Sequence, residues 1–162
     1  MVHAVYPGSF DPVTRGHMDI ICRAARMFDK VTVAVARNYN KPSGYFTPEE
    51  RAEMIRRCST DLANVEVDIC DGLLADYVRR IGATVVVKGL RAMSDFEQEF
   101  QQALINRTLN PDMETLFIAS SGEHMYLSSS MVKQVGALGG DISGFVPPQV
   151  KEDIIRRIIS KV

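Results

Sequence analysis

Hydrophobic and polar positions follow two different periods along the chain. Runs of β-branched and other apolar residues predict strands, and they are separated by segments in which apolar side chains return at helical spacing. The run after Lys30 and the run at 83–87 carry no charge, as is typical of strands covered on both faces. The predicted strands are residues 2–6, 30–36, 65–69, 83–87 and 116–119.

Capping patterns mark where helices begin. Thr47 precedes Pro48 and stands three residues before Glu50, which combines an N-cap, a proline at the first helical position and a capping box. Ser94 and Glu97 predict a second capping box. Further helices are expected at residues 18–28, 73–80, 128–138 and about 148–161.

The helix predicted after Ser94 has two distinct faces, because its apolar and polar residues separate at helical spacing. We expect an apolar stripe to face the core: Phe96, Phe100, Ala103 and Leu104. We expect a polar stripe to be available for a ligand site: Glu99, Gln102 and Asn106.

Five strand–helix repeats predict an α/β fold. We expect a Rossmann-like, doubly wound, five-stranded parallel sheet with helices on both faces. The sequence has no internal repeat or linker, so residues 1–162 are expected to form a single domain that includes the helix at about 148–161. In such sheets ligands bind outside the carboxyl ends of the strands, where the strand order reverses. Chemistry should therefore be sought directly after each strand.

The composition narrows the classes of protein. Of 162 residues, 46% are hydrophobic and 24% charged, which suits one globular domain. Lys and Arg total 19 against 20 for Asp and Glu, so the net charge of −1 disfavours general binding to nucleic acid or to a membrane. His3, Asp11 and Arg15 interrupt the N-terminal region, and no stretch approaches the ~20 apolar residues of a membrane span. We expect a soluble, cytoplasmic protein.

The chain has too few cysteines and histidines for a fold that is stabilised by disulfides or by a bound metal ion. Cys22, Cys58 and Cys70 are odd in number and form no C-x-x-C pair. We expect them to be buried free thiols rather than disulfides or zinc ligands. With three histidines in the chain, we expect no metal cage built by the protein itself.

The turn after the first strand carries the strongest chemical signal. Residues 6–17 read Y-P-G-S-F-D-P-V-T-R-G-H, in which glycines and prolines predict a tight turn. Gly16 and His17 lie at the start of the next helix, where free N–H groups and the helix dipole attract phosphate. A lone histidine there more often bonds to backbone. Its company with Ser9, whose hydroxyl can also meet a phosphate, favours an anion site.

Three cations follow other strands. Lys41 lies in the polar loop after the second strand, and Lys88 and Arg91 flank a glycine at the end of the fourth. Each is suited to phosphate. Most loop lysines are merely solvated, however, and Arg91 could instead pair with Asp95 or Glu97.

The serines at 128–130 begin a helix after the fifth strand and predict a second anion-binding helix start. Simple N-capping accounts for one of the three. The chain has neither a G-x-x-x-x-G-K-[ST] loop nor a G-x-G-x-x-G turn, which disfavours P-loop kinases and dehydrogenases. It also has no legible hydrolase triad.

Taken together, G-S-F-D-P-V-T-x-G-H and the downstream S-S-S resemble the nucleotidyltransferase superfamily with its [HT]-x-G-H signature. Lys88-Gly-Leu-Arg91, the segment from Asp95 to Glu99, and Asn106-Arg107 extend the likeness over essentially the whole chain. Within the superfamily these segments are similar to the bacterial phosphopantetheine adenylyltransferase family.

The resemblance implies a reversible reaction in coenzyme A synthesis. ATP would transfer AMP to 4'-phosphopantetheine, giving dephospho-CoA and pyrophosphate in the penultimate step, with Mg²⁺ carried by the ATP phosphates. It also implies a homohexamer and feedback inhibition by CoA. The nucleophile would be a phosphate monoester, already charged at neutral pH because its second pKa is ~6, so an in-line attack needs no general base.

The resemblance also implies roles for residues. Those implied in catalysis are His17, Ser9, Lys41 and Arg91. Those implied in ATP binding are Ser9, Phe10, His17, Gly89, Leu90, Arg91, Glu99, His124, Met125, Tyr126, Leu127, Ser128, Ser129 and Ser130. Those implied in binding the second substrate are Ser9, Lys41, Leu74, Lys88 and Asn106.

The chain departs from the family pattern at four of these positions. Ser9 stands where many members have threonine, and Lys88 where arginine is common. Leu127 replaces the usual isoleucine, and His124 stands where some members place an aromatic residue beside adenine.

Two other kinds of function stay open at this point. Another transferase of the superfamily could act on nicotinamide mononucleotide or glycerol phosphate, although the segments 88–91 and 95–99 favour pantetheine. A non-catalytic nucleotide or CoA sensor could use the same pocket. A nucleic-acid-binding role is disfavoured, because the charge balance offers no basic face.

Overall fold

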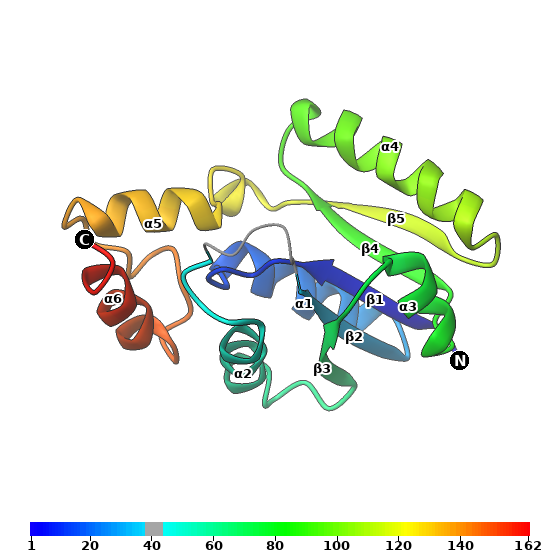
Figure 1. The fold of residues 1–162 in the computed structure, drawn as a ribbon, viewed down its shortest axis with the longest axis horizontal. Helices are drawn as coiled ribbons and strands as arrows, with labels where there is room; N and C mark the ends of the chain where they lie inside the picture. Colours follow the sequence, from blue (N-terminus) through cyan, green and yellow to red (C-terminus); the bar gives the residue numbers. More distant parts are fainter. Residues whose placement is uncertain (38–43) are drawn as a thin grey trace.

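The structure is a computed structural model that describes residues 1–37 and 44–162. Strands and helices alternate along the chain, as Figure 1 shows. The strands are β1 His3–Gly8, β2 Lys30–Ala36, β3 Val65–Cys70, β4 Val85–Leu90 and β5 Glu114–Ala119. The helices are α1 Arg15–Met27, α2 Pro48–Cys58, α3 Leu74–Arg80, α4 Met93–Leu109, the 3₁₀ turn η1 Gly122–His124, α5 Ser129–Ala137 and α6 Lys151–Ile159.

The five strands form one parallel sheet in the order β3-β2-β1-β4-β5. β1 pairs with β2 along its whole length. Among the described residues it pairs with β4 only through Ala4 and Val5, near its start. β1 and β4 therefore separate toward their carboxyl ends, where the strand order also reverses.

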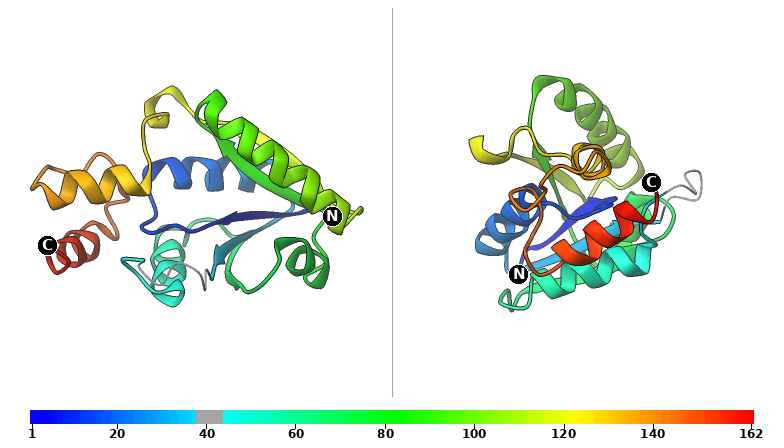
Figure 2. Two further views of the ribbon diagram at one scale, coloured as in Figure 1. Left: turned by 45° about the horizontal axis from the view of Figure 1, so that its top comes forward. Right: turned by 90° about the vertical axis from the view of Figure 1, so that its left-hand side faces the viewer.

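Side chains of the central strands alternate between two apolar clusters, one on each face. Val33 and Val35 of β2 join a cluster with residues of α1, α2, α5 and α6, whereas Ala34 joins a second cluster with residues of α3. α4 packs beside α3 and along β4 and β5. The predicted doubly wound sheet is confirmed, and α5 and α6 lie beyond its carboxyl end (Figure 2).

The two predicted capping boxes had different outcomes. At α2, Thr47 Oγ1 accepts from Glu50 N at 3.2 Å, and the Glu50 carboxylate accepts from Thr47 N at 2.8 Å, so this prediction is confirmed. The box at Ser94 was wrong. α4 begins at Met93, and its N-cap Ala92 has no side chain that could accept a hydrogen bond.

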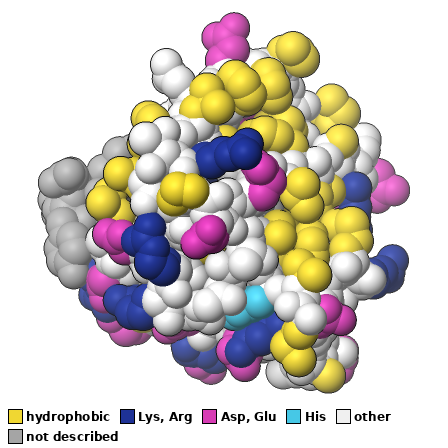
Figure 3. Space-filling view, turned by 90° about the vertical axis from the view of Figure 1, so that its right-hand side faces the viewer, with side chains coloured by type: hydrophobic (Ala, Val, Ile, Leu, Met, Phe, Trp, Pro, Cys, Tyr) yellow, Lys and Arg dark blue, Asp and Glu magenta, His cyan; other side chains and the backbone are white. Residues whose placement is uncertain are grey.

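The predicted faces of α4 were wrong in part: Phe96 meets Phe117 of β5 as expected, but other residues do not follow the prediction. Phe100 and Leu104 are 46% and 52% exposed, whereas Asn106, expected on the open polar face, is 5% exposed. Apolar residues occur on more than one side of this helix, since Ile105 is exposed as well. The helical spacing of apolar residues in α4 therefore does not identify which side of the helix the sheet covers. Hydrophobic side chains gather in patches on the face of the molecule drawn in Figure 3.

The cysteines are free thiols, as predicted. Cys70 is buried, but Cys22 and Cys58 are only half-buried. Burial raises the pKa of Cys58 to about 11 and also raises that of the other two. None of the described helices combines the length and apolar character needed to cross a membrane.

Candidate active site

A cavity of about 400 Å³ opens where β1 and β4 separate. Its walls come from the turn after β1, the start of α1, the end of β4, α4, η1 and the start of α5. It brings together many residues predicted from the sequence: Ser9, Phe10, Gly16, His17, Lys88, Gly89, Arg91, Glu99, His124, Leu127, Ser128 and Ser129.

Other residues predicted for the site lie elsewhere. Met125, Tyr126 and Ser130 are exposed beside the cavity, and Leu90 follows Gly89 without lining it. Leu74 packs against the α3-side apolar cluster, and Asn106 is buried on α4. Lys41 falls outside the described residues.

Sequence reasoning missed several residues that line the cavity, among them Tyr6, Thr14, Ile20 and Ser120. One of them carried a usable signal, because Thr14 stands three residues before His17, the spacing of a capping box. Ile20 and Ser120 reach the cavity through packing, which no local pattern announces.

His17 is held by the N-terminal cap of α1. The backbone N–H of Thr14 donates to His17 Nδ1 at 3.0 Å, and His17 N donates to Thr14 Oγ1 at 3.2 Å. Because Nδ1 accepts a backbone hydrogen bond, the proton of the neutral ring resides on Nε2. His17 thus offers an N–H donor without a charge.

Burial, and to a smaller extent the positive charge of Arg91, lowers the pKa of His17 from its ordinary 6.5 to about 4. The imidazole is therefore neutral at physiological pH. A neutral histidine already bonded at Nδ1 is suited to donate to a phosphate oxygen rather than to remove a proton.

Phe10 adopts an unusual backbone conformation beside His17. Its φ is 51°, in the left-handed region that costs a non-glycine residue about 1–3 kcal/mol. Its buried ring meets the ring of Tyr6 edge-on at 5.3 Å and that of His17 at 5.0 Å. A Cβ at Gly8 would stand 2.9 Å from this ring, so glycine is required there.

Two helix starts reach the cavity, and some of their N–H groups already have partners. At α1, Arg15 N donates to Phe145 O and His17 N to Thr14, which leaves Gly16 N–H without a partner in the described part of the chain. At α5, Ser128 caps Met131 N, and Ser129 Oγ donates to Pro12 O. The three serines therefore have three different environments.

The cations at the end of β4 are paired with carboxylates of α4. Lys88 Nζ lies 3.1 Å from Glu99 Oε2, and Arg91 Nε lies 3.2 Å from Asp95 Oδ2. Arg91 Nη1 also donates to Leu127 O at 2.7 Å. The predicted ion pair of Arg91 with Asp95 is therefore confirmed, and Arg91 also lines the cavity.

Comparison with known proteins shows the family of this chain. The cytidylyltransferase-like family model matches residues 5–135. Phosphopantetheine adenylyltransferase of Rubrobacter xylanophilus is 52% identical over 98% of this chain and 95% of its own, and that of Geobacter sulfurreducens is 57% identical over 92% and 90%. The chain belongs to the phosphopantetheine adenylyltransferase family. It is accordingly a nucleotidyltransferase.

Solved structures agree on the fold. A putative nicotinate-nucleotide adenylyltransferase from Vibrio parahaemolyticus matches 97% of this chain and 96% of its own with a TM-score of 0.68 at 17% identity. A bifunctional NMN adenylyltransferase/ADP ribose pyrophosphatase from Francisella tularensis matches 96% of this chain and 49% of its own, with a TM-score of 0.75 at 16% identity. At these identities the likeness concerns the fold alone.

The described part of this phosphopantetheine adenylyltransferase family member offers few groups that could hold a metal ion. The described residues contain no cluster of three or more His, Cys, Asp or Glu side chains that could hold an ion. The cavity's two carboxylates, Asp95 and Glu99, already face cations.

Proposed function

We propose that this protein transfers AMP from ATP to 4'-phosphopantetheine and releases pyrophosphate, reversibly, forming dephospho-CoA. The observation that carries the proposal is the pairing of a neutral donor, His17, with two cations, Lys88 and Arg91, across one cavity. Its support also includes full-length relatives with this activity in their names.

The reaction requires no proton transfer at the step of attack. An oxygen of the pantetheine phosphate forms a bond to the α-phosphorus of ATP, and the bond from that phosphorus to the β-phosphate oxygen breaks. Pyrophosphate leaves with the electron pair. Catalysis is then positioning and stabilisation of the charge that builds up on the α-phosphate oxygens.

In this mechanism His17 Nε2–H donates to an α-phosphate oxygen, and the open N–H of Gly16 adds a second neutral donor at the start of α1. Arg91 accompanies the ATP phosphates. Lys88 holds the phosphate of the second substrate, which must replace Glu99 as its partner. Ser9, in the turn between β1 and α1, lines the same cavity.

Magnesium fits this site only as a companion of the nucleotide. Asp95 and Glu99 are each paired with a cation, so an ion would be held mainly by ATP phosphates and water, as Mg²⁺ prefers. When bound, it would neutralise charge on the phosphates. His17, Lys88 and Arg91 orient the reacting groups around it.

The substrate is tested by pyrophosphate release from ATP with two acceptors. We expect release to depend on 4'-phosphopantetheine and to be at least 100-fold slower with nicotinamide mononucleotide at the same concentration. Equal rates with the two acceptors would overturn the substrate assignment. ATP binding without turnover for either would favour a sensor.

The homohexamer, inhibition by CoA and the cytoplasmic location remain predictions from the sequence. Light scattering during gel filtration tests the first, since a hexamer would have six times the chain mass of 18.0 kDa. Inhibition of pyrophosphate release by added CoA tests the second.

A further inference from the structure

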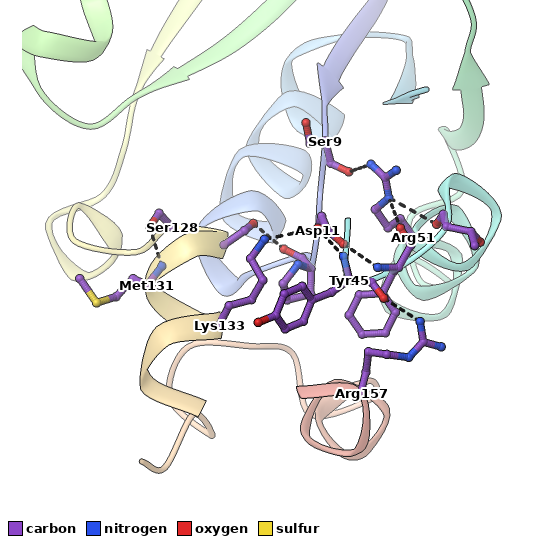
Figure 4. A network of polar contacts seen from close by, with 12 residues as sticks. Ser9, Asp11, Tyr45, Arg51, Ser128, Met131, Lys133 and Arg157 are labelled. Carbon is purple, nitrogen blue, oxygen red and sulfur yellow. Dashed lines mark hydrogen bonds and ion pairs between the residues drawn. The ribbon is translucent and has the colours of Figure 1, made fainter. Parts of the chain in front are cut away.

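Arg51 of α2 is a buried arginine with an unusual set of partners. The residue is 8% exposed, and its guanidinium bonds to main-chain carbonyls of three separate segments (Figure 4). Nη1 donates to Ser9 O at 2.6 Å and to Ala36 O at 3.4 Å. Nε donates to Phe46 O at 3.1 Å and to Thr47 O at 3.3 Å. A buried guanidinium that donates to several main-chain carbonyls indicates that its role is to fix the positions of these carbonyls.

The bond to Ser9 O determines how the next peptide group is turned. In a trans peptide the C=O and the N–H point in opposite directions, so a carbonyl fixed on Arg51 turns the Phe10 N–H away from Arg51. Ser9 and Phe10 line the cavity, and Arg51 does not. Phe10 N–H has no hydrogen-bond partner within residues 1–37 and 44–162. It is therefore available to a ligand on the cavity side.

The other side of Phe10 is fastened as well. The carboxylate of Asp11 accepts from Phe46 N at 2.9 Å and from Tyr45 N at 3.0 Å, and Lys133 Nζ lies 3.3 Å from it. Because Arg51 binds the carbonyl of Phe46, these contacts close a ring around the turn (Figure 4). The ring holds Phe10 at its positive φ from both neighbouring residues.

We propose that Arg51 is a positioning residue for adenylyl transfer: it orients the Ser9–Phe10 peptide so that the Phe10 N–H meets a phosphate of the nucleotide. The proposal rests on the proposed function, because it assigns the cavity to ATP. Arg51 itself touches no substrate. It acts through a main-chain donor whose direction it sets.

The arginine fork matters for this role. Nε and Nη1 bind carbonyls of different segments at the same time, which a lysine ammonium cannot reproduce with the same geometry. Burial lowers the pKa of Arg51, and the nearby charge of Asp11 opposes that shift.

The test compares Arg51→Met and Arg51→Lys with Arg57→Met. Arg57 lies on the same helix and likewise donates to a main-chain carbonyl, Gln149 O, and to the Asp153 carboxylate, but away from the cavity. With rates normalised to ATP-binding sites counted by calorimetry, we expect kcat to fall at least tenfold in Arg51→Met and between threefold and tenfold in Arg51→Lys. The KM for 4'-phosphopantetheine should change less than threefold. Arg57→Met should lose stability but keep kcat.

A direct readout uses protein labelled with ¹⁵N at its seven phenylalanines, with the Phe10 signal identified by its loss in Phe10→Tyr. ATP should shift the Phe10 amide signal in the wild type, and this shift should shrink in Arg51→Lys and vanish in Arg51→Met. A Phe10 shift that is the same in these variants, or a kcat within threefold of wild type, overturns the proposal. If Arg51→Met does not fold, Arg51→Lys decides by the same two measurements.

Failure of the proposed function would look different. A wild type without adenylyl transfer to 4'-phosphopantetheine defeats the substrate assignment. The ATP-induced shift of the Phe10 amide, and its dependence on Arg51, would still decide the positioning role.

Discussion

The two walls of the cavity use different physics. On the β1–α1 wall the donors are neutral, His17 Nε2–H and the N–H of Gly16, and main-chain hydrogen bonds hold the histidine ring. On the β4–α4 wall the donors are charged, Lys88 and Arg91, and each is paired with a carboxylate. The first wall is organised before any ligand arrives, whereas the second must exchange a carboxylate for a phosphate. Preorganised donors stabilise a transition state, and exchangeable ones select and retain substrates.

The largest effect should come from the neutral wall. His17→Ala removes the donor to the α-phosphate, and we expect kcat to fall by about 10²–10³, or about 2.7–4 kcal/mol. ATP affinity by calorimetry should change little. His17→Gln, whose amide nitrogen can donate from a similar place, should recover part of the rate.

His3 provides the matched control, because it bonds to Thr32 at the opposite end of β1. His3→Gln should keep the wild-type rate.

The rate should fall at low pH with a midpoint at pH ~6, the second pKa of the substrate phosphate, in wild type and in His17→Gln alike. Unchanged turnover in His17→Ala would contradict the role of the neutral wall.

The next effect should come from the charged wall. Lys88→Met removes a cation and leaves the Glu99 carboxylate facing the incoming phosphate. We expect kcat/KM for 4'-phosphopantetheine to fall about 10–100-fold, in line with the ~1.5–3 kcal/mol of a charged hydrogen bond. Lys88→Arg should stay within about threefold, because the charge is kept. Steady-state kinetics with each substrate varied would expose an effect confined to ATP, which would refute this assignment.

The pH dependence of folding should report the neutral wall separately. The folded pKa of His17, about 4, lies below the ordinary 6.5, so the unfolded chain takes up a proton before the folded chain does. Stability due to the neutral ring is therefore complete above pH 6.5 and is lost as pH falls toward 4, by at most about 3 kcal/mol. The free energies of unfolding of wild type and His17→Gln, measured by denaturant titration, should converge as the pH falls over this range. A difference between the two that stays constant with pH would mean that His17 is not held neutral.

The smallest effect should come from loosening an ion pair. Asp95→Asn releases Arg91 from a partly exposed carboxylate, a contact worth about 0.2–1 kcal/mol. We expect ATP to bind about 2–5-fold more tightly at low salt, with the gain disappearing as salt rises. Calorimetry at two salt concentrations measures this. Weaker binding would mean that Asp95 itself contacts the nucleotide.

The sequence predicted the β1–α1 wall better than the β4–α4 wall. Ser9, Gly16 and His17 belong to one short segment whose turn residues and helix start act locally, and the structure brings them into one cavity. The orientation of α4 was predicted correctly for Glu99 but wrongly for Phe100, Leu104 and Asn106, because the choice among its apolar sides depends on which one β4 and β5 cover. Asn106 accordingly lies buried away from the cavity.

By itself the sequence determined the parallel α/β sheet, the capping box of α2, the turn from β1 into α1 and the family to which the chain is similar. These features depend on residue types within a few positions of one another. Only the tertiary structure decided that β1 and β4 part after Val5, that burial keeps the ring of His17 neutral, and that Arg51 reaches Ser9 across 42 positions. Such contacts join segments that meet only after packing, and a buried donor takes whichever carbonyl the fold brings within reach.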